Sequence, residues 1–172
     1  NAQIGEMAWQ FLAVNDNSTL IVTRLKATRH IVAYIVRRQG SRLTLDRMPE
    51  LPIAYRGNFA AALAGPPEAL QLMILGGSDG QFRGCMDCRN ETHMLDLRTG
   101  TWSAGPPMPE ARSALAATRL PDGSVPAPGG WTRKAAWGRG PSATAERWDP
   151  VTRRFEAVAP MPTGTARHRG VF

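Results

Sequence analysis

Short apolar runs, each ended by a turn sequence, recur along the whole chain. Runs of this length that are rich in β-branched residues and bounded by Gly, Pro, Asn or Asp predict strands rather than helices. Two prolines, Pro126 and Pro128, fall inside one run, and since proline cannot donate to a β ladder we expect that strand to be short or bulged. The predicted strands are 9–14, 19–22, 30–36, 42–45, 58–63, 70–75, 91–97, 101–103, 113–120, 124–127, 143–148 and 153–157.

A block of the sequence occurs twice with an offset of 53 residues. An apolar run ends at Gly76-Gly77, and another ends at Gly129-Gly130. Self-similarity near 50 residues, with Gly-Gly after an apolar strand, resembles the kelch repeat, in which each repeat is one four-stranded blade of a β-propeller. The fold class predicted is therefore all-β. The other landmarks at the same offset are Asp96 with Asp149, Trp102 with Phe155, and Met108-Pro109 with Met161-Pro162.

The repeat divides the chain into blades. Residues 1–52 are predicted to form a divergent blade that lacks Gly-Gly, 53–107 and 108–160 kelch blades, and 161–172 the first strand of a further blade. The 172 residues hold about three and a quarter repeats, whereas propellers close with typically four to eight blades. We therefore expect an incomplete propeller, finished by other blades of the same longer chain or by a partner protein.

The charge of the chain is strongly positive, with 21 Lys and Arg against 14 Asp and Glu. Such a balance can indicate nucleic acid or a membrane surface as partner. Here the basic groups, such as Arg37-Arg38 and Arg153-Arg154, are short and scattered, and no aromatic residues alternate with them. We expect no nucleic-acid partner, while an acidic glycan or protein fits the charge. Without an apolar run of 18 residues, we also expect no membrane span.

Two cysteines, Cys85 and Cys88, lie in a polar insertion of the second blade. We expect them to form a small loop-closing disulfide; a redox motif would require a cytosolic setting, and a zinc site needs more ligands than the nearby His93 adds. Asn17 and Asn90 each begin an Asn-X-Ser/Thr glycosylation sequence. Together these features favour an extracellular or secretory location.

Two motifs carry a more specific resemblance. The segments Met108-Pro109-Glu110-Ala111-Arg112 and Leu120-Pro121-Asp122-Gly123 resemble the propellers of galactose oxidase and glyoxal oxidase. Those are secreted copper-radical oxidases, which oxidise an alcohol or aldehyde and reduce dioxygen to hydrogen peroxide. The resemblance implies one copper held by two histidines and two tyrosines, one tyrosine being cross-linked to a cysteine. One tyrosine and one histidine form an adjacent pair in that family.

The position of that pair is Arg167-His168 in this chain. His168 matches the histidine and is a candidate metal ligand, whereas Arg167 replaces the tyrosine and cannot ligate copper. The other ligands would lie outside this chain. We therefore expect no catalytic residue and no cofactor here, with copper in the full-length protein as the alternative.

Counting seven residues from each Met of Met-Pro gives Tyr55, Leu115 and His168. Tyr55, Arg167 and His168 are thus candidate pocket or rim residues; alternatively, Tyr55 packs between blades and His168 is an exposed loop residue. The favoured function is a non-catalytic propeller module in extracellular binding or assembly, and the alternative is part of a copper-radical oxidase that makes hydrogen peroxide from aldehydes or alcohols. Loops at 78–90 and 131–141 would make the contacts through Asp79, Arg83, Trp131, Arg133, Lys134 and Trp137.

Overall fold

The chain folds into antiparallel β-sheets. The computed structural model describes residues 9–54, 57–78, 85, 87–133 and 141–166, and these form three sheets joined by turns and loops. The chain divides into two compact units, Asn1–Tyr55 and Arg56–Phe172. Within the described part of the chain, no helix has the length and apolar character needed to cross a bilayer.

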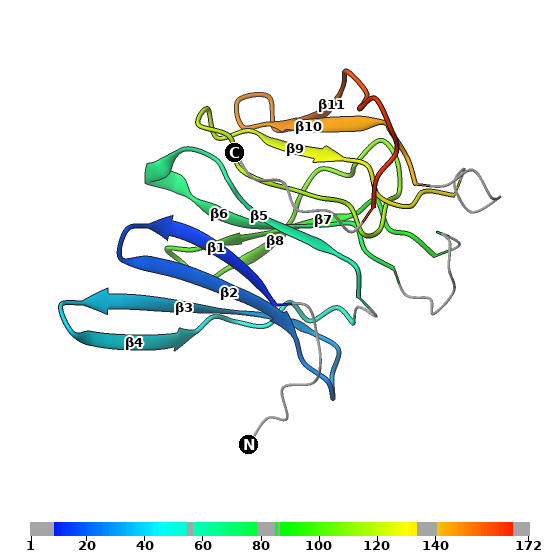
Figure 1. The fold of residues 1–172 in the computed structure, drawn as a ribbon. Coiled ribbons are helices and arrows are strands. Elements are labelled where there is room, and N and C mark those ends of the chain that lie inside the picture. Colours follow the sequence, from blue (N-terminus) through cyan, green and yellow to red (C-terminus); the bar gives the residue numbers. More distant parts are fainter. Residues whose placement is uncertain (1–8, 55–56, 79–84, 86, 134–140, 167–172) are drawn as a thin grey trace. The chain divides into compact units, whose positions relative to one another are not determined.

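The first unit is one four-stranded sheet in the order β1-β2-β3-β4 (Figure 1). Its strands lie where the apolar runs predict them, although β3 extends beyond the predicted end into a polar hairpin. Cross-strand pairing of apolar residues, such as Leu20 opposite Ile35, sets the register. The bounds are β1 (Gln10–Asn15), β2 (Ser18–Arg24), β3 (Ile31–Gln39) and β4 (Arg42–Arg47).

The second unit begins with another four-stranded meander. Its strands are β5 (Ala60–Ala64), β6 (Gln71–Leu75), β7 (Thr92–Asp96) and β8 (Trp102–Ala104), in the order β5-β6-β7-β8. A short 3₁₀ helix, η1 (Pro67–Ala69), lies in the proline-containing turn between β5 and β6. These four strands lie within residues 53–107.

The last sheet has three regular strands in the described region. They are β9 (Val125–Pro128), β10 (Ala145–Asp149) and β11 (Arg154–Val158). Their order is β11-β10-β9. The prediction of a continuous strand over 113–120 is wrong.

Two prolines account for the missing strand. Pro128 turns its carbonyl oxygen toward Ala116, whose N–H lies 3.4 Å away. Pro126 lies two positions earlier in β9, so its backbone faces the same edge of the strand. Neither proline has an N–H, and neither can donate a backbone hydrogen bond from this edge to residues 113–120. In addition, Ala114 has a positive φ of 53°, which breaks an extended conformation. The isolated bridge between Ser113 and Trp131 and single hydrogen bonds, such as that from Ala116 to Pro128, join this segment to the last sheet in place of a continuous ladder.

The repeat is visible in the backbone hydrogen bonds of the second unit. The N–H of Gly77 donates to the carbonyl of Arg112 at 2.9 Å, and 53 residues later Gly130 donates to Thr165 at 2.8 Å. All four glycines of the two Gly-Gly pairs have positive φ. A Cβ on Gly130 would lie 2.7 Å from the backbone oxygen of Ser113. The Gly-Gly pairs are therefore required by both backbone conformation and close backbone approach.

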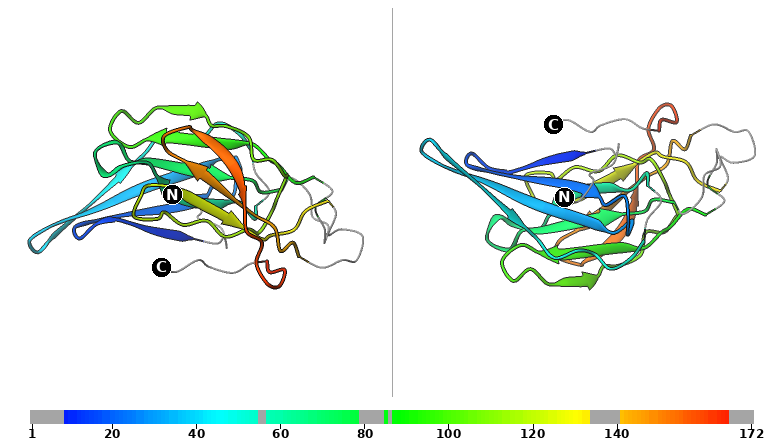
Figure 2. Two further views of the ribbon diagram at one scale, coloured as in Figure 1. Left: turned by 90° about the horizontal axis from the view of Figure 1, so that it is seen from above. Right: turned by 90° about the horizontal axis from the view of Figure 1, so that it is seen from below.

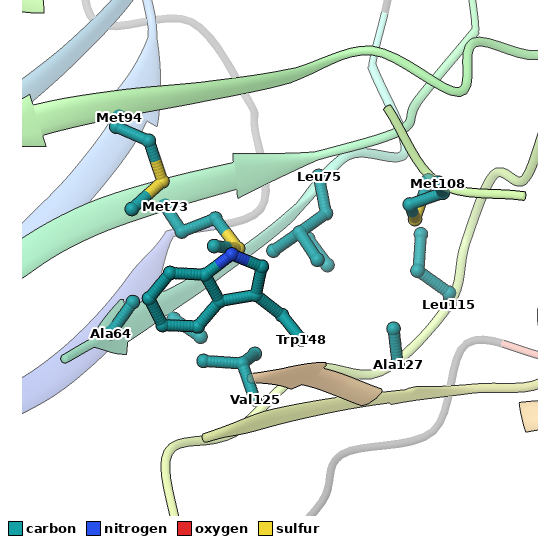
Figure 3. Packing of buried hydrophobic residues seen from close by; sticks show 11 residues of the cluster. Ala64, Met73, Leu75, Met94, Met108, Leu115, Val125, Ala127 and Trp148 are labelled. Atoms are coloured by element: carbon teal, nitrogen blue, oxygen red, sulfur yellow. The ribbon is translucent and has the colours of Figure 1, made fainter. Parts of the chain in front are cut away.

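An apolar layer fills the space between the two sheets of the second unit (Figure 3). Figures 1 and 2 show β9–β11 lying across one face of β5–β8. Trp148 is 3% exposed and packs among small and methionine side chains, which adapt to its shape. This is the contact expected between neighbouring propeller blades. The cluster consists of Ala60, Ala62, Ala64, Met73, Leu75, Met94, Met108, Leu115, Val125, Ala127 and Trp148, with Ala117 and Phe155 beside it.

We predict that Gly76→Ala destabilises the protein more than Gly40→Ala. Both glycines have nearly the same φ, 57° and 61°, so each alanine costs about 1 kcal/mol of backbone strain. A Cβ at Gly76 would also collide with the backbone oxygen of Arg112, whereas none of the atoms around Gly40 lies within 4 Å. We expect an additional loss of about 1–3 kcal/mol at Gly76, measured by urea unfolding. Equal losses would contradict this account of the Gly-Gly pair.

Candidate binding face at the blade ends

The longer connections of the second unit lie together at one end. In Figure 1 the tight turns β5–β6, β7–β8 and β10–β11 lie at one end of the unit. The described parts of the β6–β7 and β9–β10 connections, and the connection from β8 to the last sheet, lie at the opposite end. In a β-meander these two sets of connections must alternate between the ends. We call the end with the longer connections the loop end.

A disulfide lies at the loop end. Cys85 and Cys88 are bonded to each other, with their Cα atoms 4.9 Å apart, and Cys85 is fully buried. Both sulfur atoms lie against the carbonyl oxygen of Trp131, at 2.6 and 3.6 Å. Trp131 in turn exchanges backbone hydrogen bonds with Ser113, at 2.8 and 3.0 Å. The β6–β7 loop therefore packs against the start of the β9–β10 loop.

Arg112 forms the charged centre of the loop end, although its side chain is buried. One terminal guanidinium nitrogen donates to the carbonyl oxygen of Gly129 at 2.7 Å and to that of Thr144 at 3.2 Å. The other donates to the Thr144 hydroxyl at 2.6 Å and to Glu146 Oε1 at 3.0 Å. It also lies 3.1 Å from Glu110 Oε2. A buried charge is stable only with such partners.

Glu146 is the buried partner of this arginine. It lies on β10 and is 3% exposed. Burial raises the pKa of the Glu146 carboxyl, while the Arg112 charge opposes that rise and Glu110 adds a smaller upward contribution. The Arg112 charge therefore favours the ionised form of the Glu146 carboxyl, against the effect of burial.

A pocket of about 450 Å³ adjoins this ion cluster. Its walls are the connection that enters the last sheet and the neighbouring parts of β10 and β11, with Arg133 of the β9–β10 loop among them. Glu146 and Trp148 are two positions apart on β10, and Ala157 lies opposite Glu146, so this part of the pocket lining is on the same sheet face as Trp148. The lining residues are Pro109, Glu110, Ala111, Arg112, Arg133, Thr144, Ala145, Glu146 and Ala157.

The predicted site residues are only partly within the described chain. Trp131 is half-buried and Arg133 is exposed, both at the loop end. Asn17 is exposed in the β1–β2 turn, and the amide of Asn90 donates to the Met108 carbonyl at 3.2 Å. The other predicted residues lie outside the described residues: Tyr55, Asp79, Arg83, Lys134, Trp137, Arg167 and His168.

Sequence reasoning missed Glu146 and the role of the Arg112 side chain. Arg112 belongs to a quoted motif, but nothing in that motif indicates burial. The sequence does offer one signal of a buried ion pair: Arg112 begins an apolar segment, and Glu146 lies inside a later predicted strand. Pairing them requires knowing that Thr144 and Glu146 approach Arg112 in the fold.

The described residues do not fit a copper site. No group of three or more His, Cys, Asp or Glu side chains in the described ranges could hold a metal ion. His30 contacts Glu50 at 3.0 Å, and His93 is buried in β7 with a pKa that burial lowers. No step of copper chemistry is therefore derived from these residues.

Comparison with known proteins identifies the fold. No profile of a known protein family matches the sequence, and no curated protein matches it. The solved structure of YjhT, a kelch-type fold, matches 93% of this chain with a TM-score of 0.70 and 13% identity. A fungal alcohol oxidase of the AA5 family, in complex with copper, matches 74% of it with a TM-score of 0.55 and 14% identity.

The chain spans about half of the YjhT structure, 53%, and 27% of the oxidase. At these identities the likeness is one of fold alone. Together with the three antiparallel sheets, it confirms the predicted fold. The described sheets have the fold of part of a β-propeller, similar to those of the kelch-type and galactose oxidase-like structures.

We predict that Arg112→Met costs about 3–5 kcal/mol of folding free energy, because it leaves Glu146 buried without its counter-ion. The double substitution Arg112→Met with Glu146→Leu should recover most of this loss. Removing Arg112 raises the pKa of Glu146 further, and a raised carboxyl pKa favours folding only while the group is protonated. The Arg112→Met deficit should therefore be smaller near pH 4 than at pH 7.

The control is Arg98→Met, which removes an exposed arginine from the β7–β8 turn. Its effect should stay within about 0.5 kcal/mol. Urea unfolding of the wild type and the three variants at both pH values provides the measurement. An Arg112→Met loss that is independent of pH, or unchanged in the double variant, would refute the coupling to Glu146.

Proposed function

We propose that the chain is a non-catalytic propeller module that binds an extracellular partner through its loop end. The proposal is supported chiefly by one observation: the disulfide loop and the β9–β10 loop meet at Trp131. Binding residues on propellers are carried by loops that the blades hold in place. The described parts of these two connections are already joined at Trp131, so fewer of their residues have to be ordered on binding.

The base of this surface is fixed by backbone hydrogen bonds. The N–H of Arg89 donates to the Gly77 carbonyl at 3.0 Å, and the N–H of Arg112 donates to the Arg89 carbonyl at 3.0 Å. The Gly-Gly pair, the disulfide loop and the blade connection are thus consecutive members of one network. A ligand that contacts the loop end would meet a preorganised backbone.

The charge of the chain favours an acidic partner. Arg133 is exposed beside the pocket, while Arg112 is already neutralised by Glu110 and Glu146. The formal net charge of +7 adds long-range attraction for anions. A sulfated glycan is the simplest probe of this chemistry.

An oxidising compartment is the setting we propose. The Cys85–Cys88 disulfide persists outside the cytosol, where thiols are not kept reduced. The Asn17 sequence lies in an exposed hairpin turn, where a glycan can be accommodated. Both features agree with an extracellular module.

A second candidate is part of a copper-radical oxidase, which the likeness to the fungal alcohol oxidase favours. The two positions that the sequence resemblance singles out, Arg167 and His168, lie outside the described residues. Copper content and peroxide release of the intact protein distinguish this candidate from the binding module.

We predict that the chain binds immobilised heparin and that Arg133→Ala weakens this binding about two- to fivefold, the size of one partly exposed ionic contact. Arg42→Ala is the matched control, because it removes the same charge from the exposed β3–β4 hairpin. Dissociation constants at fixed salt provide the measurement. Equal weakening by both variants would indicate attraction by net charge alone and count against a site at the loop end.

We also predict a single N-linked glycan, on Asn17, when the chain is secreted from eukaryotic cells. Asn90 is disfavoured because its amide is hydrogen-bonded to Met108, and Thr92 of the same sequence is buried with its hydroxyl donating to Pro106 at 2.7 Å. Asn17→Gln should abolish the mass shift on glycosidase treatment, and Asn90→Gln should not. A secreted chain without any glycan, or with one on Asn90, would contradict this prediction.

A further inference from the structure

The lining of the pocket at the loop end contains two buried polar atoms that no described residue satisfies. One is Oε2 of Glu146, an acceptor, and the other is the Nε–H of Arg112, a donor. Glu146 is 3% exposed and Arg112 is fully buried, and both residues line the pocket. Buried polar atoms without a partner are uncommon, because they have lost their hydrogen bonds to water and gained none. The two atoms therefore point to a group that enters from the pocket.

The unused acceptor and the unused donor belong to the same ion pair. Oε1 of Glu146 accepts from a terminal nitrogen of Arg112 at 3.0 Å. Oε2 is bonded to the same carbon as Oε1, and Nε is bonded to the same carbon as that nitrogen. Each is thus one covalent step from a single contact, and both lie within the span of one small ligand.

The chemistry of the two atoms selects a hydroxyl group. A hydroxyl accepts a hydrogen bond from the Nε–H of Arg112 and donates one to Oε2 of Glu146. An ammonium group cannot accept from the Nε–H, and an anionic group is repelled by the carboxylate. Glu110, whose Oε2 lies 3.1 Å from Arg112, places a second carboxylate in the same cluster. A ligand that presents hydroxyl groups there fits both atoms.

The rest of the lining leaves room for a ligand of several atoms. The volume of about 450 Å³ lies within the range of small-molecule sites. Pro109, Ala111 and Ala157 contribute small apolar side chains, which can pack against the C–H groups of a sugar ring. Ala157 lies opposite Glu146 in the β10–β11 pair, and its small side chain leaves space beside the carboxyl group.

The repeat shows that a four-stranded sheet of this kind forms without the ion pair. At the offset of 53 residues before Arg112 and Glu146, the sequence has Phe59 and His93. The strands β5–β8 nevertheless form a complete meander. The charged pair is therefore a particular feature of this pocket.

We propose that the pocket binds one sugar unit of a glycan through its ring hydroxyls. One hydroxyl accepts from Arg112 Nε and donates to Glu146 Oε2, and the ring packs against Pro109 and Ala157. Acidic groups on neighbouring units of the glycan meet Arg133, which is exposed on the pocket lining. The inference deepens the proposed binding function and rests on it for the acidic character of the glycan. The hydroxyl contact itself requires no charge on the ligand.

Uncharged probes test the hydroxyl contact, because the net charge of the chain does not attract them. The probes are the methyl pyranosides of glucose, galactose, mannose, xylose and N-acetylglucosamine. Saturation-transfer NMR should show that at least one of them binds the wild-type chain. The fully O-methylated form of that glycoside should show no transfer, because it has no hydroxyl that can donate to Glu146.

Ala157→Leu fills the pocket without changing a charge, and it should weaken glycoside binding at least about tenfold. Ala104→Leu is the matched control, because Ala104 is the equivalent residue at the offset of 53, is exposed and lies outside the pocket lining. It should bind the glycoside as the wild type does. Circular dichroism and urea unfolding establish that both variants are folded.

An absence of transfer from all five glycosides would overturn the inference, because water alone would then meet the two atoms. Binding of the O-methylated form, or equal binding by the wild type and Ala157→Leu, would also overturn it. If no glycoside binds but heparin binding still depends on Arg133, only the pocket inference is refuted. If glycosides bind but Arg133→Ala weakens heparin binding no more than Arg42→Ala, only the acidic partner of the loop end is refuted.

Discussion

The second unit depends on an arginine whose charge is held away from water. Transfer of a charged group into a protein interior costs several kcal/mol unless hydrogen bonds and counter-ions compensate. Arg112 receives that compensation from Gly129, Thr144 and Glu146. These acceptors belong to the end of one strand and the start of another, so the guanidinium fixes both. Loss of any one acceptor leaves the charge without part of its compensation.

The same residue also joins two blades. Its backbone carbonyl accepts the Gly77 N–H of the β5–β8 blade, while its side chain binds groups of the β9–β11 blade. The glycine pair allows this approach because any side chain at Gly76 would collide with that carbonyl. Backbone conformation and buried charge are therefore two parts of one junction. The disulfide loop lies directly beside it, which explains why the loop end is the braced end of the unit.

The blades could be predicted from the sequence because their landmarks repeat, and the junction could not because it does not. At the offset of 53 residues, Thr165 occupies the place of Arg112 and His93 that of Glu146. A pair present only once gives no periodic signal. The wrong prediction of a strand at 113–120 has another cause: the hydrophobic pattern of this segment is that of a strand, but Pro126 and Pro128 remove the donors that a ladder would need. The hydrophobic pattern of 113–120 was therefore overridden by the prolines of the neighbouring strand, β9.

The state of the charged groups also bears on what the loop end can do. Both terminal nitrogens of Arg112 are engaged by protein groups, and Glu146 is held by that arginine. Residues committed in this way support a site better than they perform chemistry, since a catalytic acid or base must exchange protons with a substrate. In the described part of the loop end, contact with a partner falls to exposed groups such as Arg133. A hydrogen-bonded backbone that supports exposed charged groups is the arrangement of a binding surface. This is why we favour binding over catalysis.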